Sequence, residues 1–383
     1  MDTESFDLLL NTVQRFVQER LVPAEQQVEE ENAIPDDLAD EIRELGLFGL
    51  AIAEEYGGLG LSMEEEVRVA LELGQTSPAF RSLVGTNIGI GSQSIIMTGT
   101  EEQKKHYLPR LATGELIGSF ALTEPDAGSD ALSIKTTAKR DGNDYVLNGT
   151  KRYITNAPVA GLFTVMARTG EGRSADAISC FLIDKDQAGL TLGKPDKKMG
   201  QRGALTCDVI LDNCRVPASA LLGAAEGNGF RTAMKVLDKG RLHIAAICVG
   251  MAERLIRESV NFAVNREQFG QKISDFQLVQ AMIADSKADT LAAKALVMET
   301  ARLRDNKQRI TLQAAAAKMF SSEMLGRIAD RAVQIHGGAG YMSEYPVEHF
   351  YRDARLFRIY EGTTQIQQLI IARETIAEIV NQS

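Results

Sequence analysis

The chain has 383 residues, which is enough to bury a large core and to form two or three domains. A hydrophobic content of 44% and a charged content of 25% are typical of a soluble globular protein. The formal net charge of −10 provides no general basic field, so we expect no nucleic-acid partner. An anionic small molecule remains compatible with this charge, because it needs only a local basic patch.

The four cysteines and the four histidines lack the spacing of a disulfide framework or of a metal site. No CxxC or HExxH pattern occurs among them. We therefore expect reduced, mostly buried thiols, structural histidines and no bound metal. These residues are Cys180, Cys207, Cys214 and Cys248, and His106, His243, His336 and His349.

The amino-terminal segment shows no targeting signal. It enters helical periodicity at once, with neither a basic segment before an apolar one nor an Arg-rich, acid-poor stretch. No uninterrupted apolar run reaches the roughly 18 residues that a membrane span needs. We expect a cytoplasmic protein without a membrane span, unless a leader was removed from the chain.

Residues 1–117 are predicted to be helical. Apolar residues recur at helical spacing between Phe6 and Phe16 and again after Pro35. A glycine-rich segment at 57–60 interrupts the pattern before a further helix, and Gly114 lies near the end of the region.

Residues 118–225 change to a pattern typical of β-strands. Residues 139–155 alternate polar and apolar side chains, and Asp141-Gly142 and Asn148-Gly149 both predict hairpin turns. Further strands, rich in Val, Ile and Phe, are predicted at 162–167, 178–183 and 207–211. The segment therefore predicts a compact β domain.

Residues 226–383 return to long Ala- and Leu-rich helices, which usually form a bundle. Three helices are predicted at 230–265, 276–304 and 311–336, and a last helix follows Glu361. The order along the chain is helical, then β, then helical, which predicts an α+β protein.

The segment IYEGTTQIQ (359–367) places Glu361 just before this last helix. Thr363 is predicted to cap the helix, because its hydroxyl can accept a hydrogen bond from a free backbone N–H. Ile366, Leu369 and Ile370 then form one apolar stripe. Glu361 would project from an anchored turn, where a side chain can face a ligand. The alternative is an acid favoured there by the positive end of the helix dipole.

A second segment, FALTEPDAGSD (120–130), predicts a strand end followed by a tight turn. It exposes backbone N–H groups and the hydroxyls of Thr123 and Ser129, which suit a polar heteroaromatic ring or a phosphate. No complete G-x-G-x-x-G and no Walker A sequence is present, so a Rossmann mode of dinucleotide binding is disfavoured.

Together the two segments resemble the acyl-CoA dehydrogenase family, which carries a Thr-Glu-Pro-x-x-Gly-Ser-Asp loop and a Tyr-Glu-Gly-Thr turn. Further matches follow in the family's order at 151–156, 265–270, 334–338 and 351–355. The resemblance covers nearly the whole chain. It implies the acyl-CoA dehydrogenase fold, with an N-terminal helical domain (1–117), a middle β domain (118–225) and a C-terminal four-helix bundle (226–383).

The resemblance also implies non-covalently bound FAD. Thr123 would face the pyrimidine edge of the flavin, and Thr155 would lie close to its reactive nitrogen. Arg266 and Gln277 would reach the FAD of a neighbouring subunit, and an arginine fork suits a pyrophosphate. The implied cofactor residues are Phe120, Leu122, Thr123, Gly128, Ser129, Tyr153, Ile154, Thr155, Arg266, Phe269, Gln277, Gln334, Gly337, Gly338, Thr363 and Gln365.

Several of these residues have a structural alternative when each is taken alone. Arg266 could form a surface ion pair, Gly337 and Gly338 could end a helix, and Tyr153 could belong to the core.

For the substrate, the resemblance implies contacts from Ser129, Asp238, Arg241 and Gly362. Some family members carry their catalytic glutamate at the position of Gly240, so here Glu361 alone fills a known base position. The segment AFRS (79–82) resembles glutaryl-CoA dehydrogenases, in which the arginine meets a distal carboxylate. Arg81 could thus select a dicarboxylyl-CoA such as glutaryl- or adipyl-CoA, or it could be a surface or internally paired arginine. The C-terminal half is more similar to short- and medium-chain acyl-CoA dehydrogenases.

The implied activity is an oxidoreductase reaction of fatty acid β-oxidation, in which an acyl-CoA becomes a trans-2-enoyl-CoA. Glu361 would remove the α-proton while the β-hydrogen leaves as hydride to the flavin. An electron-transferring flavoprotein would then accept the electrons, and the subunits would form a homotetramer. The alternatives are an acyl-CoA oxidase that uses oxygen and a catalytically silent relative that only binds coenzyme A.

Overall fold

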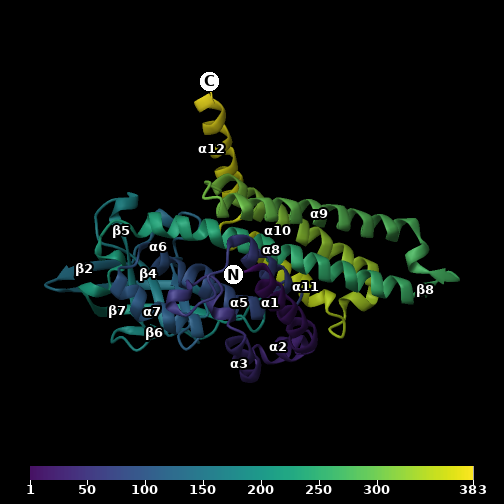
Figure 1. The fold of residues 1–383 in the computed structure, drawn as a ribbon, viewed down its shortest axis with the longest axis horizontal. Helices are drawn as coiled ribbons and strands as arrows, with labels where there is room; N and C mark the ends of the chain where they lie inside the picture. The colour runs from purple at the N-terminus through teal and green to yellow at the C-terminus, as the bar shows by residue number, and fades with distance from the viewer. Residues whose placement is uncertain (383) are drawn as a thin grey trace.

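The computed structural model describes residues 1–382, which form a helical part, a β-sheet part and a second helical part in that order (Figure 1). Among these residues, no helix has both the length and the apolar character to cross a bilayer. The first part contains α1 (Thr3–Phe16), α2 (Glu25–Glu31), α3 (Asp36–Glu44), α4 (Met63–Leu73), α5 (Pro78–Gly85), α6 (Gln93–Thr98) and α7 (Glu101–Thr113).

Local sequence explains where these helices begin and continue. Ser62 and Thr100 start α4 and α7 with capping boxes, in which the hydroxyl accepts a hydrogen bond from a backbone N–H three residues later. Helix α5 begins with Pro78 at its first position and continues into a π-helical segment, Thr86–Gly91. Such widened turns are frequent at functional sites.

The sheet runs in the order β1-β4-β2-β3-β7-β6, and β5 pairs with β4. β1 is parallel to β4, with Phe120 opposite Thr164, whereas β3 is antiparallel to both β2 and β7. The strands are β1 (Gly118–Ala121), β2 (Thr137–Asp141), β3 (Asp144–Thr155), β4 (Leu162–Arg168), β5 (Ile178–Asp184), β6 (Leu190–Leu192) and β7 (Thr206–Pro217).

Of the two predicted hairpin turns, one is confirmed and one is wrong. β2 and β3 are joined at Asp141 and Gly142 as predicted. Asn148 and Gly149 instead lie inside β3, where the pairing with β7 shifts by one residue. A Cβ on Gly149 would come within 2.4 Å of the Thr136 hydroxyl, so the glycine allows two segments to approach closely rather than a chain reversal.

The C-terminal part contains α8 (Gly229–Asn265), α9 (Gln277–Asp305), α10 (Thr311–His336), α11 (Val347–Ala354) and α12 (Thr364–Gln382), with a small hairpin of β8 (Glu267–Gln268) and β9 (Gln271–Lys272). α8, α9 and α10 pack against one another, and α12 contacts α10. The predicted helix at 311–336 matches α10, while its two predecessors differ from α8 and α9 by one residue at some ends.

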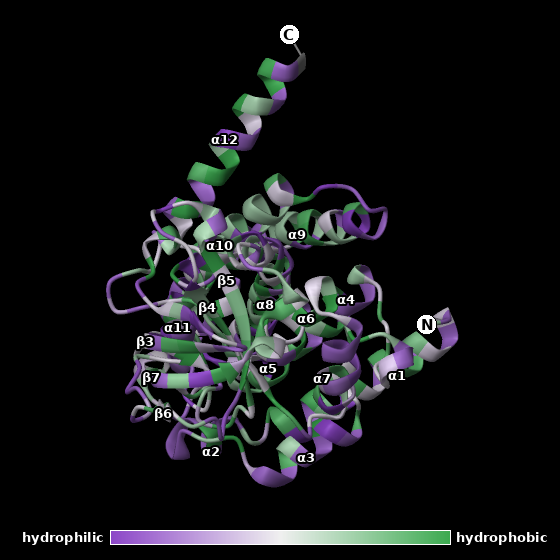
Figure 2. Ribbon diagram, turned by 90° about the vertical axis from the view of Figure 1, so that its left-hand side faces the viewer, coloured by the Kyte–Doolittle hydropathy of each residue, from purple (hydrophilic) through white to green (hydrophobic). Residues whose placement is uncertain are grey.

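One continuous apolar core joins the two helical parts. Val67 and Leu71 of α4 belong to the same buried cluster as Ile247 and Met251 of α8. The sheet buries a separate cluster around Phe163 and on its other side packs against helices. Figure 2 shows hydrophobic colour concentrated in the strands and helices of the body, and α12 extending away from it. The three parts therefore meet along shared boundaries, where a cavity can form.

Candidate active site

A cavity of about 360 Å³ lies where the three parts meet. α5 and its π-helical extension form one wall, the ends of β1 and β3 a second, and the first turns of α8 a third. The turn before α12 and the loop before β7 complete the lining. Twelve of the residues predicted for the site line this cavity, namely Arg81, Phe120, Leu122, Thr123, Gly128, Ser129, Tyr153, Ile154, Thr155, Arg241, Glu361 and Gly362.

The other predicted residues do not line it. Arg266 and Phe269 lie at the β8–β9 hairpin, which Figure 1 shows at the opposite end of the long helices from the sheet, and Phe269 is 95% exposed. Gly337, with a φ of +59°, ends α10, as its structural alternative proposed. The remaining residues outside the lining are Asp238, Gln277, Gln334, Gly338, Thr363 and Gln365.

Asp238 nevertheless supports the lining through Arg241. Its carboxylate accepts hydrogen bonds from the Arg241 guanidinium at 2.6 Å and from the Thr311 hydroxyl at 3.0 Å. The Arg241 Nε is buried and has no partner within residues 1–382, so one donor of this side chain remains free at the cavity.

Glu361 occupies a strained turn at the cavity. Its φ is +52°, in the left-handed region that costs a side-chain-bearing residue about 1–2 kcal/mol, and Gly362 follows with a φ of +89°. The residue lines the cavity, but its Oε2 is sealed from solvent and bonded to no atom of residues 1–382. A Cβ on Gly240 would lie 2.1 Å from this oxygen, so only glycine there leaves room for the carboxylate.

Buried side chains hold the backbone of this turn. The Gln367 Nε2 donates to the carbonyls of Glu361 and Gly362 at 3.2 and 3.0 Å, and the Lys318 Nζ donates to the Gly362 carbonyl at 2.6 Å. Thr363 accepts from the Ile366 N–H at 3.2 Å, which confirms its predicted capping contact. The Glu361 N–H donates to no backbone carbonyl of residues 1–382.

The surroundings of Glu361 act on its carboxyl group in opposite directions. Burial raises the pKa of its carboxyl group above the usual range for glutamate, and Arg81, Lys318 and Arg241 oppose the shift only in part. Such a group is a stronger base when ionised than a glutamate in water. Unpartnered carboxylates of this kind concentrate at sites of proton transfer.

Arg81 lies inside the cavity wall rather than on the surface. It is 5% exposed, and its Nε has no hydrogen-bond partner within residues 1–382. The Asn156 side chain donates to the carbonyls of Ser82 and Leu83, both at 3.2 Å, and so ties α5 to the end of β3. Neither alternative for Arg81, a surface residue or an internally paired one, agrees with this geometry.

The loop from Leu122 to Ser129 is held by a buried ion pair. Glu124 accepts hydrogen bonds from the backbone N–H groups of Lys135 and Thr136 and from the Lys151 Nζ at 2.7 Å. The same Nζ donates to the Leu122 carbonyl at 3.2 Å. This pair fixes the base of the loop and leaves its hydroxyl groups facing the cavity.

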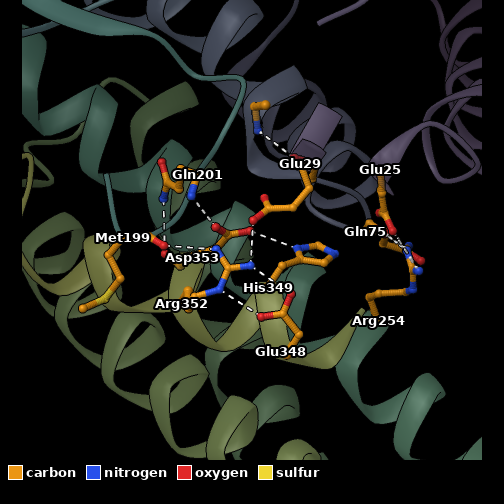
Figure 3. Close-up of polar contacts among 12 residues, drawn as sticks. Glu25, Glu29, Gln75, Met199, Gln201, Arg254, Glu348, His349, Arg352 and Asp353 are labelled. Carbon is orange, nitrogen blue, oxygen red and sulfur yellow. Dashed lines mark hydrogen bonds and ion pairs between the residues drawn. The ribbon is translucent and has the colours of Figure 1, made fainter. Parts of the chain in front are cut away.

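A polar network outside the cavity fixes another wall (Figure 3). The Gln201 N–H donates to Asp353, whose carboxylate also contacts His349 Nδ1 at 3.2 Å, and Arg352 pairs with Glu29 at 2.6 Å. Gln201 lines the cavity, and its Nε2 donates to the Asp353 carbonyl at 3.3 Å, so Asp353 positions both its backbone and its side chain. No local pattern in the sequence predicts Gln201, because its side-chain partner Asp353 lies 152 residues away along the chain.

Comparison with known proteins decides the family. Residues 3–115, 119–214 and 227–376 match the N-terminal, middle and C-terminal domains of acyl-CoA dehydrogenase. The chain is 40% identical to an acryloyl-CoA reductase (NADH) from Anaerotignum propionicum over 376 residues, which is 98% of this chain and 95% of the relative. The chain belongs to the acyl-CoA dehydrogenase family.

Solved structures agree with this acyl-CoA dehydrogenase fold. Butyryl-CoA dehydrogenase from Megasphaera elsdenii superposes with a TM-score of 0.94 and 33% identity, covering 98% of this chain and 100% of that one. A glutaryl-CoA dehydrogenase from Mycobacterium smegmatis in complex with FADH2 superposes with a TM-score of 0.91 and 32% identity, covering 98% and 95%. This member of the acyl-CoA dehydrogenase family is therefore an oxidoreductase, and its cavity joins the segments that carried the resemblance.

Proposed function

We propose that this acyl-CoA dehydrogenase oxidises an acyl-CoA thioester to the trans-2-enoyl-CoA with Glu361 as the base. The observation that carries the proposal is the Glu361 carboxylate, whose Oε2 is buried and unpartnered beside the cavity. Burying a carboxyl oxygen without a hydrogen-bond partner costs folding free energy, and a role in catalysis accounts for that cost.

FAD fits the opposite wall of the cavity. The hydroxyls of Thr123, Ser129 and Thr155 line it and make no hydrogen bond within residues 1–382, while Leu122 and Ile154 supply apolar surface. A flavin needs this combination of polar edge contacts and a flat apolar face. When bound, FAD would supply the acceptor for the β-hydrogen, and the reduced form in a related structure supports this choice.

The chain's own residues account for the proton step. Glu361 would accept the α-proton of the substrate, so the C–H electrons become available to form the new double bond. The free Glu361 N–H would donate to the thioester carbonyl, where negative charge develops. Burial strengthens both effects, because water neither screens the base nor competes for the carbonyl.

Arg81 in the cavity wall favours a substrate whose acyl chain carries a polar group. Arg81 is buried at the cavity with a free Nε, which fits a dicarboxylyl-CoA of the glutaryl or adipyl type. We expect Arg81→Met to reduce kcat/KM for glutaryl-CoA about 10- to 100-fold more than kcat/KM for butyryl-CoA. The loss common to both thioesters reflects the positive charge that Arg81 places near Glu361. An equal loss with both thioesters would contradict this selectivity.

The reverse reaction is a second candidate, because one relative is named an acryloyl-CoA reductase. In that direction Glu361 would deliver a proton to the α-carbon. Anaerobic assays of 2-enoyl-CoA reduction beside acyl-CoA oxidation would establish the physiological direction.

The electron acceptor and the assembly are part of the same proposal. An electron-transferring flavoprotein is expected as the partner, within fatty acid β-oxidation in the cytoplasm. Peroxide release in air would favour the oxidase alternative. A homotetramer is supported by exposed apolar residues on α12, such as Leu369 (66%) and Ile376 (63%), and by the β8–β9 hairpin, which lies at the opposite end of the long helices from the sheet (Figure 1). Arg266, Phe269, Gln277, Gln334, Gly337 and Gly338 would then serve the cofactor of a neighbouring subunit.

The decisive experiment is anaerobic mixing of the flavin-loaded enzyme with butyryl-, octanoyl- and glutaryl-CoA. We expect at least one thioester to bleach the flavin, and Glu361→Gln to slow bleaching by about two powers of ten or more while FAD stays bound. Bleaching at the wild-type rate in the variant would refute the base. Protein that cannot take up FAD would favour the silent relative.

A further inference from the structure

Three lysines among residues 1–382 are buried, and they differ in their partners. Lys151 pairs with Glu124 and Lys239 pairs with Glu66, each with a nitrogen–oxygen distance of 2.7 Å. Lys318 forms no ion pair in the described chain, although its side chain is fully buried. Burying an ammonium group without a carboxylate is costly, so Lys318 requires an explanation.

The one hydrogen bond from Lys318 goes to the turn that carries Glu361. Its Nζ donates to the Gly362 carbonyl at 2.6 Å, from α10 across to the segment before α12. The Gln367 side chain holds the same carbonyl from the other side at 3.0 Å. Two consecutive left-handed residues are thus clamped by donors that come from two different helices.

The charged and titratable groups that act on Lys318 lie on α8, on α10 itself and in the turn before α12. They are Cys248 and Arg241 on α8, Glu323 on α10 and Glu361 in the turn. Glu323 is already engaged by the Thr364 hydroxyl at 2.6 Å and by Arg358 at 3.3 Å. Burial lowers the pKa of Lys318 to about 8, so the side chain still carries a proton at neutral pH.

We propose that Lys318 is a positioning residue of this reaction, which clamps the Glu361–Gly362 turn and supplies a positive charge behind the base. The inference rests on the proposed role of Glu361. The clamp holds the Gly362 carbonyl and so fixes the backbone of the turn from which Glu361 lines the cavity. The charge favours the ionised carboxylate, which is the form able to accept a proton, against the burial that opposes it. Arg81 on α5 and Arg241 on α8 act on the same carboxylate from the other sides.

The test is the pH profile of substrate-dependent flavin bleaching in the loaded enzyme. Lys318→Met removes the donor and the charge, and we expect the acidic limb of the profile to move up by about one pH unit or more. Lys318→Arg retains a charge and should return the limb toward the wild-type position. A Met variant with a lower rate but an unmoved limb would overturn the electrostatic role and leave only a structural one.

The matched control is Lys294→Met, which makes the same substitution in the same set of helices at a half-exposed residue paired with Glu253. Its pH limb should stay in place. If Lys318→Met does not fold, Lys318→Gln provides an uncharged polar replacement, and an unmoved limb in that variant would equally overturn the proposal.

A readout independent of turnover is infrared difference titration of the carboxyl band that disappears in Glu361→Gln. This band should titrate at higher pH in Lys318→Met than in wild type, and coincident titrations would contradict the inference. The two proposals fail in different ways. Absence of bleaching in wild type defeats the proposed function, whereas bleaching that depends on Glu361 but has the same pH limb in every Lys318 variant defeats only this one.

Discussion

Glu124 in the sheet part holds a loop of the cavity, Glu361 in the C-terminal part lines the cavity, and the surroundings of the two carboxylates are opposite. The Glu124 carboxylate accepts from two backbone N–H groups and from Lys151. The Glu361 Oε2 is buried and accepts from none of the described residues. Burial alone would raise both pKa values, but Lys151 and the hydrogen bonds lower that of Glu124, while that of Glu361 stays raised. A satisfied carboxylate holds the loop, and an unsatisfied one remains available for proton transfer.

The largest expected effect that separates the two is on folding. Glu124→Gln leaves Lys151 buried without its counter-charge, so we expect a loss of about 3 kcal/mol in the free energy of unfolding, measured by urea titration. Glu361→Gln should leave that free energy unchanged or raise it, because it removes a buried carboxyl group whose ionised form burial disfavours. Glu115→Gln, at an exposed ion pair with Arg110, is the control and should cost less than about 1 kcal/mol. Equal losses at positions 124 and 361 would remove the distinction.

A smaller effect is expected from crowding the base without removing it. In Gly240→Ala the new Cβ meets the Glu361 Oε2, so the carboxylate must move, and we expect the rate of flavin bleaching to fall about 10- to 100-fold. Gly170→Ala, in the loop after β4 and outside the cavity lining, is the control, because the nearest atoms to a Cβ built there belong to Ala177 at 3.2 and 3.4 Å. Stopped-flow absorbance measures both rates. An unchanged rate in Gly240→Ala would show that the carboxylate position is not critical.

The smallest effect is a difference in how pH acts on stability. The pKa of Glu124 is lower in the folded than in the unfolded protein. This difference stabilises the fold at pH values above the unfolded-state pKa, and the stabilisation is lost as pH falls through the folded-state pKa. The pKa of Glu361 is higher in the folded protein, so its effect on stability is the opposite one. Stability is lost as pH rises from the unfolded-state pKa of about 4 through the folded-state pKa. The difference in Tm between wild type and each Gln variant should therefore change with pH in opposite directions. Parallel changes would contradict the assigned environments.

The sequence could predict what short segments determine. The helix at 311–336, the cap at Thr363 and the place of Glu361 before a helix all follow from local spacing, and the structure has them. The turn predicted at Asn148-Gly149 is wrong, because Gly149 is needed where Thr136 approaches the strand closely. Such a contact joins residues from different strands, and the dipeptide does not encode it.

The residues of the candidate site likewise divide into those that the sequence predicts and those that only the structure shows. The motif residues at the cavity were predicted, because each lies in a segment whose order resembles a family. Lys318, Gln367 and Gln201 were not predicted, since their roles depend on contacts between distant helices and loops. The orientation of Arg81 also required the structure, because neither a free Nε nor burial can be read from one arginine in a sequence.

The most direct test of the account is hydrogen exchange at the α-carbon of a 3-thia-acyl-CoA, which carries no β-hydrogen and so isolates the proton step. In deuterium oxide, the wild-type enzyme should introduce deuterium at this carbon, and Glu361→Gln should do so at least about 100-fold more slowly. Exchange at equal rates in the two proteins would show that Glu361 is not the base.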